Sequence, residues 1–270
     1  MPTPTRRSVI PGLIPLFFAF TVLLCALVWL LGGYPLGRAR PTPDTSSEGD
    51  ALPSVGEGTT PPITCVVIDA GHGGEDGGAS SAAGLVEKEV NLAVAFALRD
   101  LFEAAGVPVV MTRTEDILLY DRNVDFKGRK KVLDLAARRT AAEKTAAAYG
   151  GNSLLISIHM NAFPQPQYSG MQVWYSTGDP RSAEIADSIQ SASGGLMPDN
   201  TRKIKPAGSN IYLLDRVRTP AVLVECGFLS NPAEAERLSE DGYRKALAAA
   251  IFCGVAPHTG AGKVPPENGI

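Results

Sequence analysis

The sequence lacks the features of several large protein classes. It has no excess of positive charge, with 25 Lys and Arg against 28 Asp and Glu, so we expect no nucleic-acid partner. It has only four cysteines, Cys25, Cys65, Cys226 and Cys253, and no CxxC pair. This excludes a disulfide framework and a cysteine-only metal site, and we expect the cysteines to be core residues. The phosphate-loop patterns and HExxH are also absent, which removes the best-known nucleotide-binding and metallopeptidase arrangements.

One long apolar run is present near the amino terminus. It spans about residues 10–31 and follows Arg6 and Arg7. A helix of that length crosses a hydrocarbon core of about 30 Å. Because no A-x-A cleavage site follows, we expect residues 1–33 to be an uncleaved signal anchor in the membrane. Arg38 and Arg40 nearly balance the charges across the run, so the outward orientation that we adopt depends on the function.

The rest of the chain divides into a linker, one domain and a tail. Residues 34–62 are rich in Pro, Gly, Ser, Thr and acid, which predicts a flexible linker. Residues 256–270 are expected to be a disordered tail. The single domain at 63–255 is large enough to bury a core.

Within this domain, short apolar runs alternate with segments of helical periodicity. The expected strands are residues 64–71, 107–112, 153–159, 171–176, 210–214 and 221–228. Helices are expected at residues 91–105, with Asn91 as the cap, at 131–149 and at 183–192. Another helix is expected after Ser230, with Ser230 as the cap and Pro232 in the first turn. A last helix is expected at the carboxyl end of the domain. This alternation predicts an α/β fold of three layers, with a mostly parallel twisted sheet and helices on both faces.

Three of the predicted strands end in residues that suit a metal site. His72, His159 and Glu225 follow or end the runs VVIDAG, LLISI and AVLV, and only three histidines exist in the chain. Ligands gather at the carboxyl ends of strands in open α/β sheets. A histidine there could instead only hydrogen-bond a loop, but five glycines surround His72, as a crowded ligand loop requires. A lone carboxylate at Glu225 would be costly to bury without a partner.

The residues themselves do not identify a third metal ligand. Glu75, Asp76, Glu87 and Glu89 all follow His72 closely. Glu87 and Glu89 would also be favoured by the dipole at the start of the next helix, without any metal. Spacing alone leaves the four alternatives open.

At this point the motifs resemble a known family. VVIDAGHGGEDGGA, GLVEKEVNLA, VVMTRTED, LISIHMNAFP and AVLVECGFLSNPAEAERL, in this order, resemble the zinc-dependent N-acetylmuramoyl-L-alanine amidases of the type 3 family. The resemblance covers about residues 63–255. TRKIKPAGSNIYLL and the short amino-terminal anchor further resemble the spore-cortex branch of that family, the CwlD type.

The resemblance implies a ligand set and an activity. In the family, the Glu of the Glu-Lys pair after the first histidine coordinates zinc, and Glu87 matches it. The implied cofactor is Zn²⁺ held by His72, Glu87 and His159, with Glu225 as the catalytic carboxylate. The implied reaction is hydrolysis of the amide between N-acetylmuramic acid and L-alanine of peptidoglycan, in spore-cortex maturation through muramic-δ-lactam and in germination. Cys226 replaces a commoner aliphatic residue, and we expect it to point away from the metal because adjacent strand residues face opposite ways.

Substrate contacts are less determined by the sequence. Asn161 could line the site or pack behind a ligand. Arg113 could meet a carboxylate of the stem peptide, but a structural pairing with Glu115 or Asp116 is favoured. Arg202, Lys203 and Lys205 could face the anionic peptide or form a solvated loop, and either Trp174 or Tyr175 could stack on sugar.

Two rival functions are compatible with the same sequence features. One is a catalytically inactive wall-binding module, which would lack metal ligands. The other is a zinc hydrolase that cuts a different cell-wall peptide bond. The sequence shows no long insertion that would serve as an inhibitory helix, so control could come from a separate activating protein.

Overall fold

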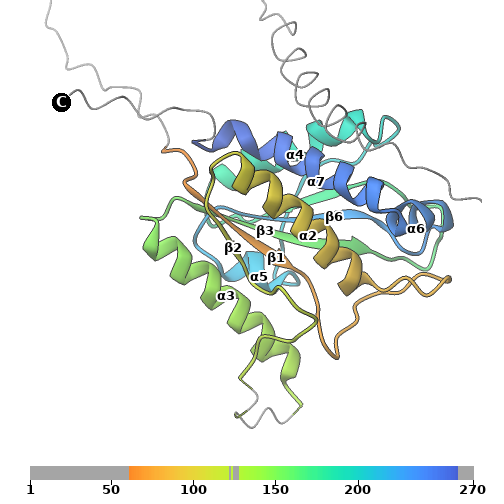
Figure 1. Ribbon diagram of the computed structural model, residues 1–270, viewed down its shortest axis with the longest axis horizontal. Coiled ribbons are helices and arrows are strands. Elements are labelled where there is room, and N and C mark those ends of the chain that lie inside the picture. Colours follow the sequence, from red (N-terminus) through yellow and green to blue (C-terminus); the bar gives the residue numbers. More distant parts are fainter. Residues whose placement is uncertain (1–60, 122, 124–127, 261–270) are drawn as a thin grey trace, which may run out of the picture. The chain divides into compact units, whose positions relative to one another are not determined.

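The computed structural model describes residues 61–121, 123 and 128–260 (Figure 1). The predicted anchor at 1–33 and the linker up to residue 60 lie outside the described residues. Within the described ranges, no helix combines the length and apolar character needed to span a bilayer.

The described residues form the predicted α/β domain around a six-stranded sheet. Its strands are β1 (Cys65–Ala70), β2 (Val109–Met111), β3 (Ser153–Asn161), β4 (Gln172–Tyr175), β5 (Lys205–Pro206) and β6 (Ala221–Phe228). The order across the sheet is β2-β1-β3-β6-β4-β5, and only the β4–β6 pair is antiparallel. The central strands β1, β3 and β6 are therefore parallel neighbours, and their carboxyl ends meet at one edge of the sheet.

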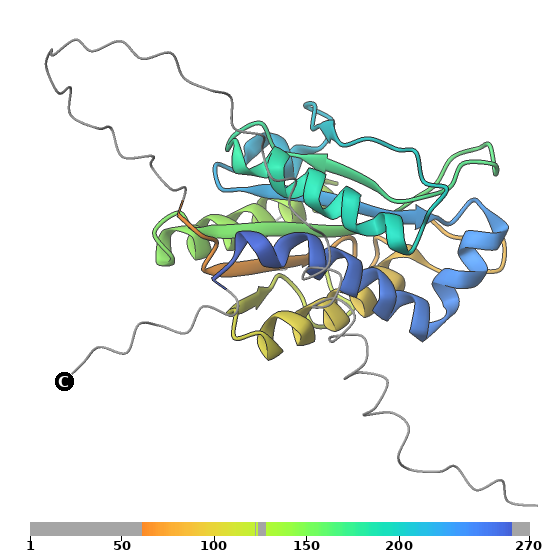
Figure 2. The same ribbon diagram turned by 90° about the horizontal axis from the view of Figure 1, so that it is seen from above.

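Helices cover both faces of the sheet. They are α2 (Glu87–Ala104), α3 (Lys130–Ala148), α4 (Arg181–Ala192), α5 (Tyr212–Arg216), α6 (Pro232–Ser239) and α7 (Asp241–Val255), with 3₁₀ turns η1 (Ser193–Gly195) and η2 (Ala256–His258). Helix α7 packs between α2 and α4 over one face, as Figures 1 and 2 show. Helices α3 and α5 contact the opposite face and bury a second, smaller core with Val67, Leu155 and Leu223. The three-layer prediction is confirmed for these residues.

The structure corrects two of the predicted elements: one is a helix rather than a strand, and the other begins at an earlier residue. Residues 210–214, predicted as a strand, contain the start of helix α5. Leu213 and Leu214 are consecutive and both buried in the second core, which a strand with alternating faces cannot achieve. The helix expected to be capped by Asn91 begins four residues earlier, at Glu87. Backbone N–H groups of Glu87 and Lys88 donate to the carbonyls of Ala79 and Gly77, so loop carbonyls replace a side-chain cap.

Two boundary predictions also need correction. Asn231 rather than Ser230 caps α6, because its side chain accepts hydrogen bonds from the first turn. The domain continues past Val255 through η2, and the Ile63 N–H donates to the His258 carbonyl at 2.8 Å. The tail predicted from residue 256 therefore has an ordered beginning. Cys253 is exposed rather than a core residue, whereas Cys65 and Cys226 are buried as expected.

Candidate metal centre

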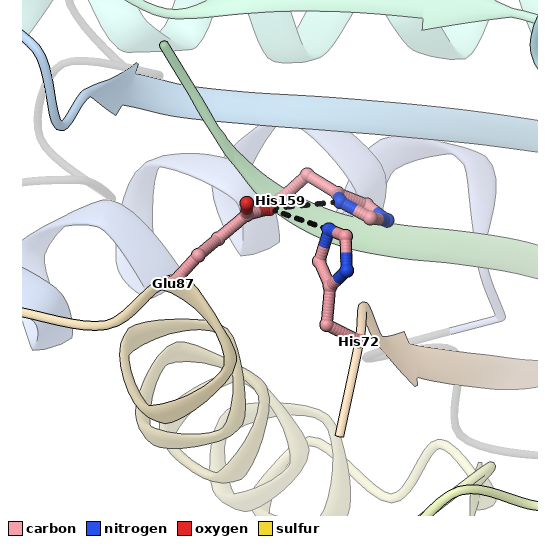
Figure 3. A group of neighbouring side chains, drawn as sticks. All are labelled: His72, Glu87 and His159. Atoms are coloured by element: carbon pink, nitrogen blue, oxygen red, sulfur yellow. Dashed lines mark hydrogen bonds and ion pairs between the residues drawn. The ribbon is translucent and has the colours of Figure 1, made fainter. Parts of the chain in front are cut away.

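Three predicted ligand residues converge at the carboxyl edge of the sheet. His72 follows β1, Glu87 is the first residue of α2, and His159 lies near the end of β3 (Figure 3). Glu87 Oε1 lies 3.2 Å from His72 Nε2 and 3.0 Å from His159 Nδ1. One ligand atom from each residue lies within 4.8 Å of the other two. The three side chains can therefore contact a single ion.

The geometry distinguishes Glu87 from the other candidate third ligands. Asp76 lies 2.9 Å from Nδ1 of His72, the nitrogen that faces away from Glu87. Glu75 is paired with Lys130 at 2.6 Å, and Glu89 is exposed. A carboxylate beside the outer nitrogen of a ligating histidine orients the ring and fixes its tautomer. Asp76 has the position of such a supporting residue, although its 2.9 Å contact with His72 Nδ1 does not have the geometry of a hydrogen bond.

The Glu87 carboxylate is buried, ionised and held in place. Burial alone would raise its pKa, but hydrogen bonds from His159 and His72 outweigh burial and keep the pKa far below its usual range. Its Oε2 accepts from the Ala79 N–H at 2.8 Å, and its Oε1 accepts from the Met160 N–H at 3.1 Å. The result is a fixed anionic oxygen facing two imidazoles, which favours a cation between them.

Asn91 supports this carboxylate from within α2. Its side-chain amide donates to Glu87 Oε1 at 3.3 Å and to the Gly71 carbonyl at 3.1 Å. Four residues separate Asn91 from Glu87, so both side chains lie on one helix face. The amide ties the start of α2 to the end of β1, a role that differs from the helix cap predicted from the sequence.

Glu225 lies beside the three ligand residues. It is the register partner of His159 across the β3–β6 pair, so both side chains are on the same face of the sheet. Burial raises its pKa to about 7; the neighbouring His159 and His72 oppose that rise, and Glu87 adds to it. Its Oε2 is buried and has no hydrogen-bond partner among the described residues. Cys226 faces the opposite core and bonds weakly to the Val224 carbonyl, as expected.

These observations fit a catalytic zinc ion. Two imidazole nitrogens and one carboxylate oxygen are a ligand set that such sites use, with a fourth position left for water or substrate. The Oε2 atom of Glu225 also indicates a bound group, because buried polar atoms almost always have hydrogen-bond partners. A water or substrate atom beside the ion would supply that partner.

Glycines in the loop after β1 are required by close approach. A methyl group at Gly71 would overlap the ring of His159, and one at Gly78 would overlap the carboxylate of Glu87. Gly78 also has a φ of 69°, and His72 itself has a φ of 60°, a conformation that is uncommon for a side chain with a Cβ. The predicted crowding of this loop is confirmed.

A buried arginine, Arg138, forms hydrogen bonds with the backbone of this strained loop. Arg138 of α3 donates from Nη2 to the His72 carbonyl at 2.7 Å and from Nη1 to the Ala70 carbonyl at 2.8 Å. It is paired at 2.7 Å with each of Asp69 and Asp134, and all three residues are at most 4% exposed. This network was not predicted from the sequence. A signal existed, because Asp69 inside the apolar run VVIDA needs a partner as much as Glu225 does.

Arg113 is structural rather than exposed to substrate. It is 2% exposed, and its guanidinium donates to the backbone carbonyls of Ala70, Gly71, Lys88 and Glu115 at 2.8–3.0 Å. Burial, with the nearby Arg138 charge, lowers its pKa. The structural interpretation is therefore supported, although the partner is the Glu115 carbonyl and not a side-chain carboxylate. A contact with the stem peptide is incompatible with this burial.

The other predicted substrate residues are not joined to the centre by any contact that the structure shows. Asn161 ends β3, and its Oδ1 accepts from the Ala162 N–H at 2.8 Å. Tyr175 packs against the larger core, whereas Trp174 packs against the smaller one under the Lys205 ammonium, 5.3 Å from the ring centre. Arg202 lies over the Phe228 ring at 4.5 Å.

Comparison with known proteins agrees with this geometry. The family model described as N-acetylmuramoyl-L-alanine amidase (Amidase_3) matches residues 66–257. The chain is 37% identical over 202 residues to the germination-specific N-acetylmuramoyl-L-alanine amidase of Bacillus subtilis, covering 75% of this chain and 82% of that protein.

Solved structures give the same result. The CwlD amidase from Clostridioides difficile, solved in complex with the GerS lipoprotein, is 35% identical with a TM-score of 0.65 and covers 72% of this chain and 98% of that one. The catalytic domain of CwlV, an N-acetylmuramoyl-L-alanine amidase from Bacillus (Paenibacillus) polymyxa, is 26% identical with a TM-score of 0.60, covering 72% and 97%. The chain thus belongs to the N-acetylmuramoyl-L-alanine amidase family.

Proposed function

We propose that this amidase hydrolyses the bond between N-acetylmuramic acid and L-alanine with a zinc ion held by His72, Glu87 and His159, and with Glu225 as the catalytic base. The observation that carries the proposal is the meeting of three ligand side chains within 4.8 Å, beside a buried carboxylate oxygen without a partner. When bound, zinc supplies Lewis acidity that polarises the scissile carbonyl and acidifies water.

Glu225 moves the proton in this reaction. Its unpartnered Oε2 accepts the proton of the attacking water and then delivers it to the leaving nitrogen of L-alanine. Burial of this carboxylate favours its protonated form, so it can hold the proton between the two steps. Asp76 orients His72, and Arg138 and Arg113 hold the loop backbone that carries it.

The test is the product formed from purified peptidoglycan. The protein should release L-alanine amino termini, lose this activity on chelation, and regain it with zinc. Glu225→Gln should keep stoichiometric zinc and lose at least about 100-fold in turnover, whereas His72→Ala should lose both zinc and activity. A Glu225→Gln protein with normal zinc and normal turnover would contradict the role given to Glu225.

The two rival functions predict different results in the same assay. An inactive wall-binding module would show no new amino termini, but such a module is expected to lack ligands, and all three are assembled here. A zinc hydrolase of another cell-wall peptide bond would release different fragments. Mass spectrometry of the digested muropeptides identifies the bond that is cut.

We also propose where the enzyme acts. An anchor at residues 1–33 would hold the domain outside the cytoplasmic membrane, next to peptidoglycan, which is its substrate. The germination-specific relative in Bacillus subtilis supports a role in the spore cortex, where removal of stem peptides allows muramic-δ-lactam to form. Muropeptide analysis of spores from cells without this protein would show whether the lactam is lost.

A separate protein partner is part of this proposal. The Clostridioides difficile amidase was solved in complex with a lipoprotein, which supports the expectation of an activating protein for this chain. Co-purification from cells, followed by measurement of zinc content with and without the partner, tests it.

A further inference from the structure

Two exposed aromatic rings and a buried ring beneath them form a cluster at the same edge of the sheet as the metal centre. Phe163 and Tyr168 come from the segment between β3 and β4, and Phe228 is the last residue of β6. Their ring centres lie 5.4 Å (Phe163 to Tyr168), 6.1 Å (Phe163 to Phe228) and 6.3 Å (Tyr168 to Phe228) apart. Phe163 and Tyr168 are 49% and 43% exposed, over a fully buried Phe228. We name these three rings the aromatic platform.

Exposed rings are uncommon in the described part of this chain. Four large apolar side chains there are at least 36% exposed: Val132, Tyr149, Phe163 and Tyr168. Two of the four lie together in the aromatic platform. Isolated exposed apolar residues need no explanation, but a cluster of them marks a binding surface.

The aromatic platform is held in place without a ligand. The Phe163 N–H donates to Ser230 Oγ at 3.0 Å, which joins the segment after β3 to the loop after β6. The Arg202 guanidinium lies 4.5 Å from the ring centre of Phe228 and 5.9 Å from that of Tyr168. A cation over a ring face stabilises this packing. A surface ordered in advance binds with little loss of conformational entropy.

Strands β3 and β6 set the position of the aromatic platform relative to the catalytic residues. Phe228 follows Glu225 by three residues in β6, and it pairs in register with Asn161, which follows His159 by two. The register shifts between these two pairs; at about 3.4 Å per residue, the Cα of Phe228 lies at most about 10 Å along β6 from that of Glu225. A substrate that is longer than the cleaved bond would reach the aromatic platform.

We propose that the aromatic platform binds a sugar ring of the glycan strand, next to the muramic acid whose amide is cleaved. This inference rests on the proposed function, because it assumes a peptidoglycan substrate. A pyranose has an apolar face of C–H groups and a polar rim, and aromatic side chains match such a shape. Phe163 and Tyr168, the exposed members of the platform, carry no charge, which favours the apolar face of a sugar over a carboxylate as their contact; the neighbouring Arg202 is itself charged and partly exposed.

The experiment measures binding of the full chain to peptide-free glycan strands of alternating N-acetylglucosamine and N-acetylmuramic acid. Phe163→Ala and Tyr168→Ala should each weaken this binding about threefold to tenfold, as expected for the loss of one stacked ring. Phe163→Trp and Tyr168→Phe keep an aromatic face and should retain binding. The Michaelis constant for intact peptidoglycan should rise in the alanine variants in parallel.

Tyr149→Ala is the matched control. Tyr149 is also exposed, but it follows α3 and precedes β3, at the opposite edge of the sheet, so its removal should leave glycan binding unchanged. Equal glycan affinity in wild type and both platform alanine variants would overturn the proposal. Loss of affinity for free stem peptide with unchanged affinity for glycan would also overturn it, by assigning the surface to the peptide. If wild type binds glycan but releases no L-alanine amino termini, the proposed function fails instead.

Discussion

Replacing Arg138 by methionine should destabilise the protein strongly at neutral pH. The substitution keeps an apolar stem of similar length but leaves Asp69 and Asp134 buried, 1% and 4% exposed, without their cation. Removing one partner of a buried ion pair costs about 3–5 kcal/mol. Domains of this kind are stable by only about 5–15 kcal/mol. We therefore expect the free energy of unfolding of the metal-free protein to fall by about 4 kcal/mol at pH 7.5.

The loss should depend on pH with a definite sign. In wild type, burial opposes ionisation of Asp69, but Arg138 outweighs burial and, with bonds from Ser157 and Thr112, keeps the pKa below its usual value. A carboxyl group of this kind adds stability above its unfolded pKa of about 3.9. Without Arg138, burial is no longer outweighed and the pKa of Asp69 rises, so the variant loses stability as pH increases above about 4. The difference between the two proteins should therefore shrink as pH is lowered from 7.5 to 5.

Urea denaturation of both proteins at the two pH values measures this difference. Adding Asp69→Asn to Arg138→Met removes one of the two buried carboxylates that have lost their cation. The double variant should therefore be more stable at pH 7.5 than Arg138→Met alone. Arg181→Met is the control, because Arg181 pairs with Asp179 at 2.8 Å where both side chains are partly exposed, and it should cost about 1 kcal/mol. A loss below about 1 kcal/mol for Arg138→Met, or a loss independent of pH, would refute the reasoning.

Three further predictions concern the metal centre. Gly71→Ala places a methyl group in the space of the His159 ring, so zinc binding measured by calorimetry should be lost or severely weakened. A zinc affinity equal to that of wild type would show that the loop can move to accommodate the methyl group. Asp76→Asn removes the carboxylate 2.9 Å from His72 Nδ1 and should weaken zinc affinity about 10–100-fold, with unchanged affinity arguing that the contact does not orient the ring. Burial raises the Glu225 pKa to about 7 from 4.5, so the metal-free protein should lose stability as pH rises from about 4.5 to 7. Glu225→Gln should abolish that part of the pH dependence in urea denaturation, and an identical slope in both proteins would contradict the raised pKa.

The sequence by itself determined the class of fold and most of the chemistry. Continuous apolar runs separated by helical periodicity are local signals, and they predicted five of the six strands and the layered arrangement. Polar residues at the ends of such runs placed His72, His159 and Glu225 at one edge, because parallel strands end together.

Only the tertiary structure decided the contacts that depend on distant segments meeting. Among the residues alone, the four acidic candidates that follow His72 were equivalent. The folded loop turns Glu87 towards His159, 72 positions away, and leaves Asp76 behind His72. Helix α5 was missed because its two consecutive leucines are buried by α3 and the sheet, which local pattern does not report. Arg138 reaches Asp69 across 69 positions, and a buried charge can be satisfied from any point in a chain. Local propensity therefore predicts the elements, whereas long-range packing decides which polar groups they bring together.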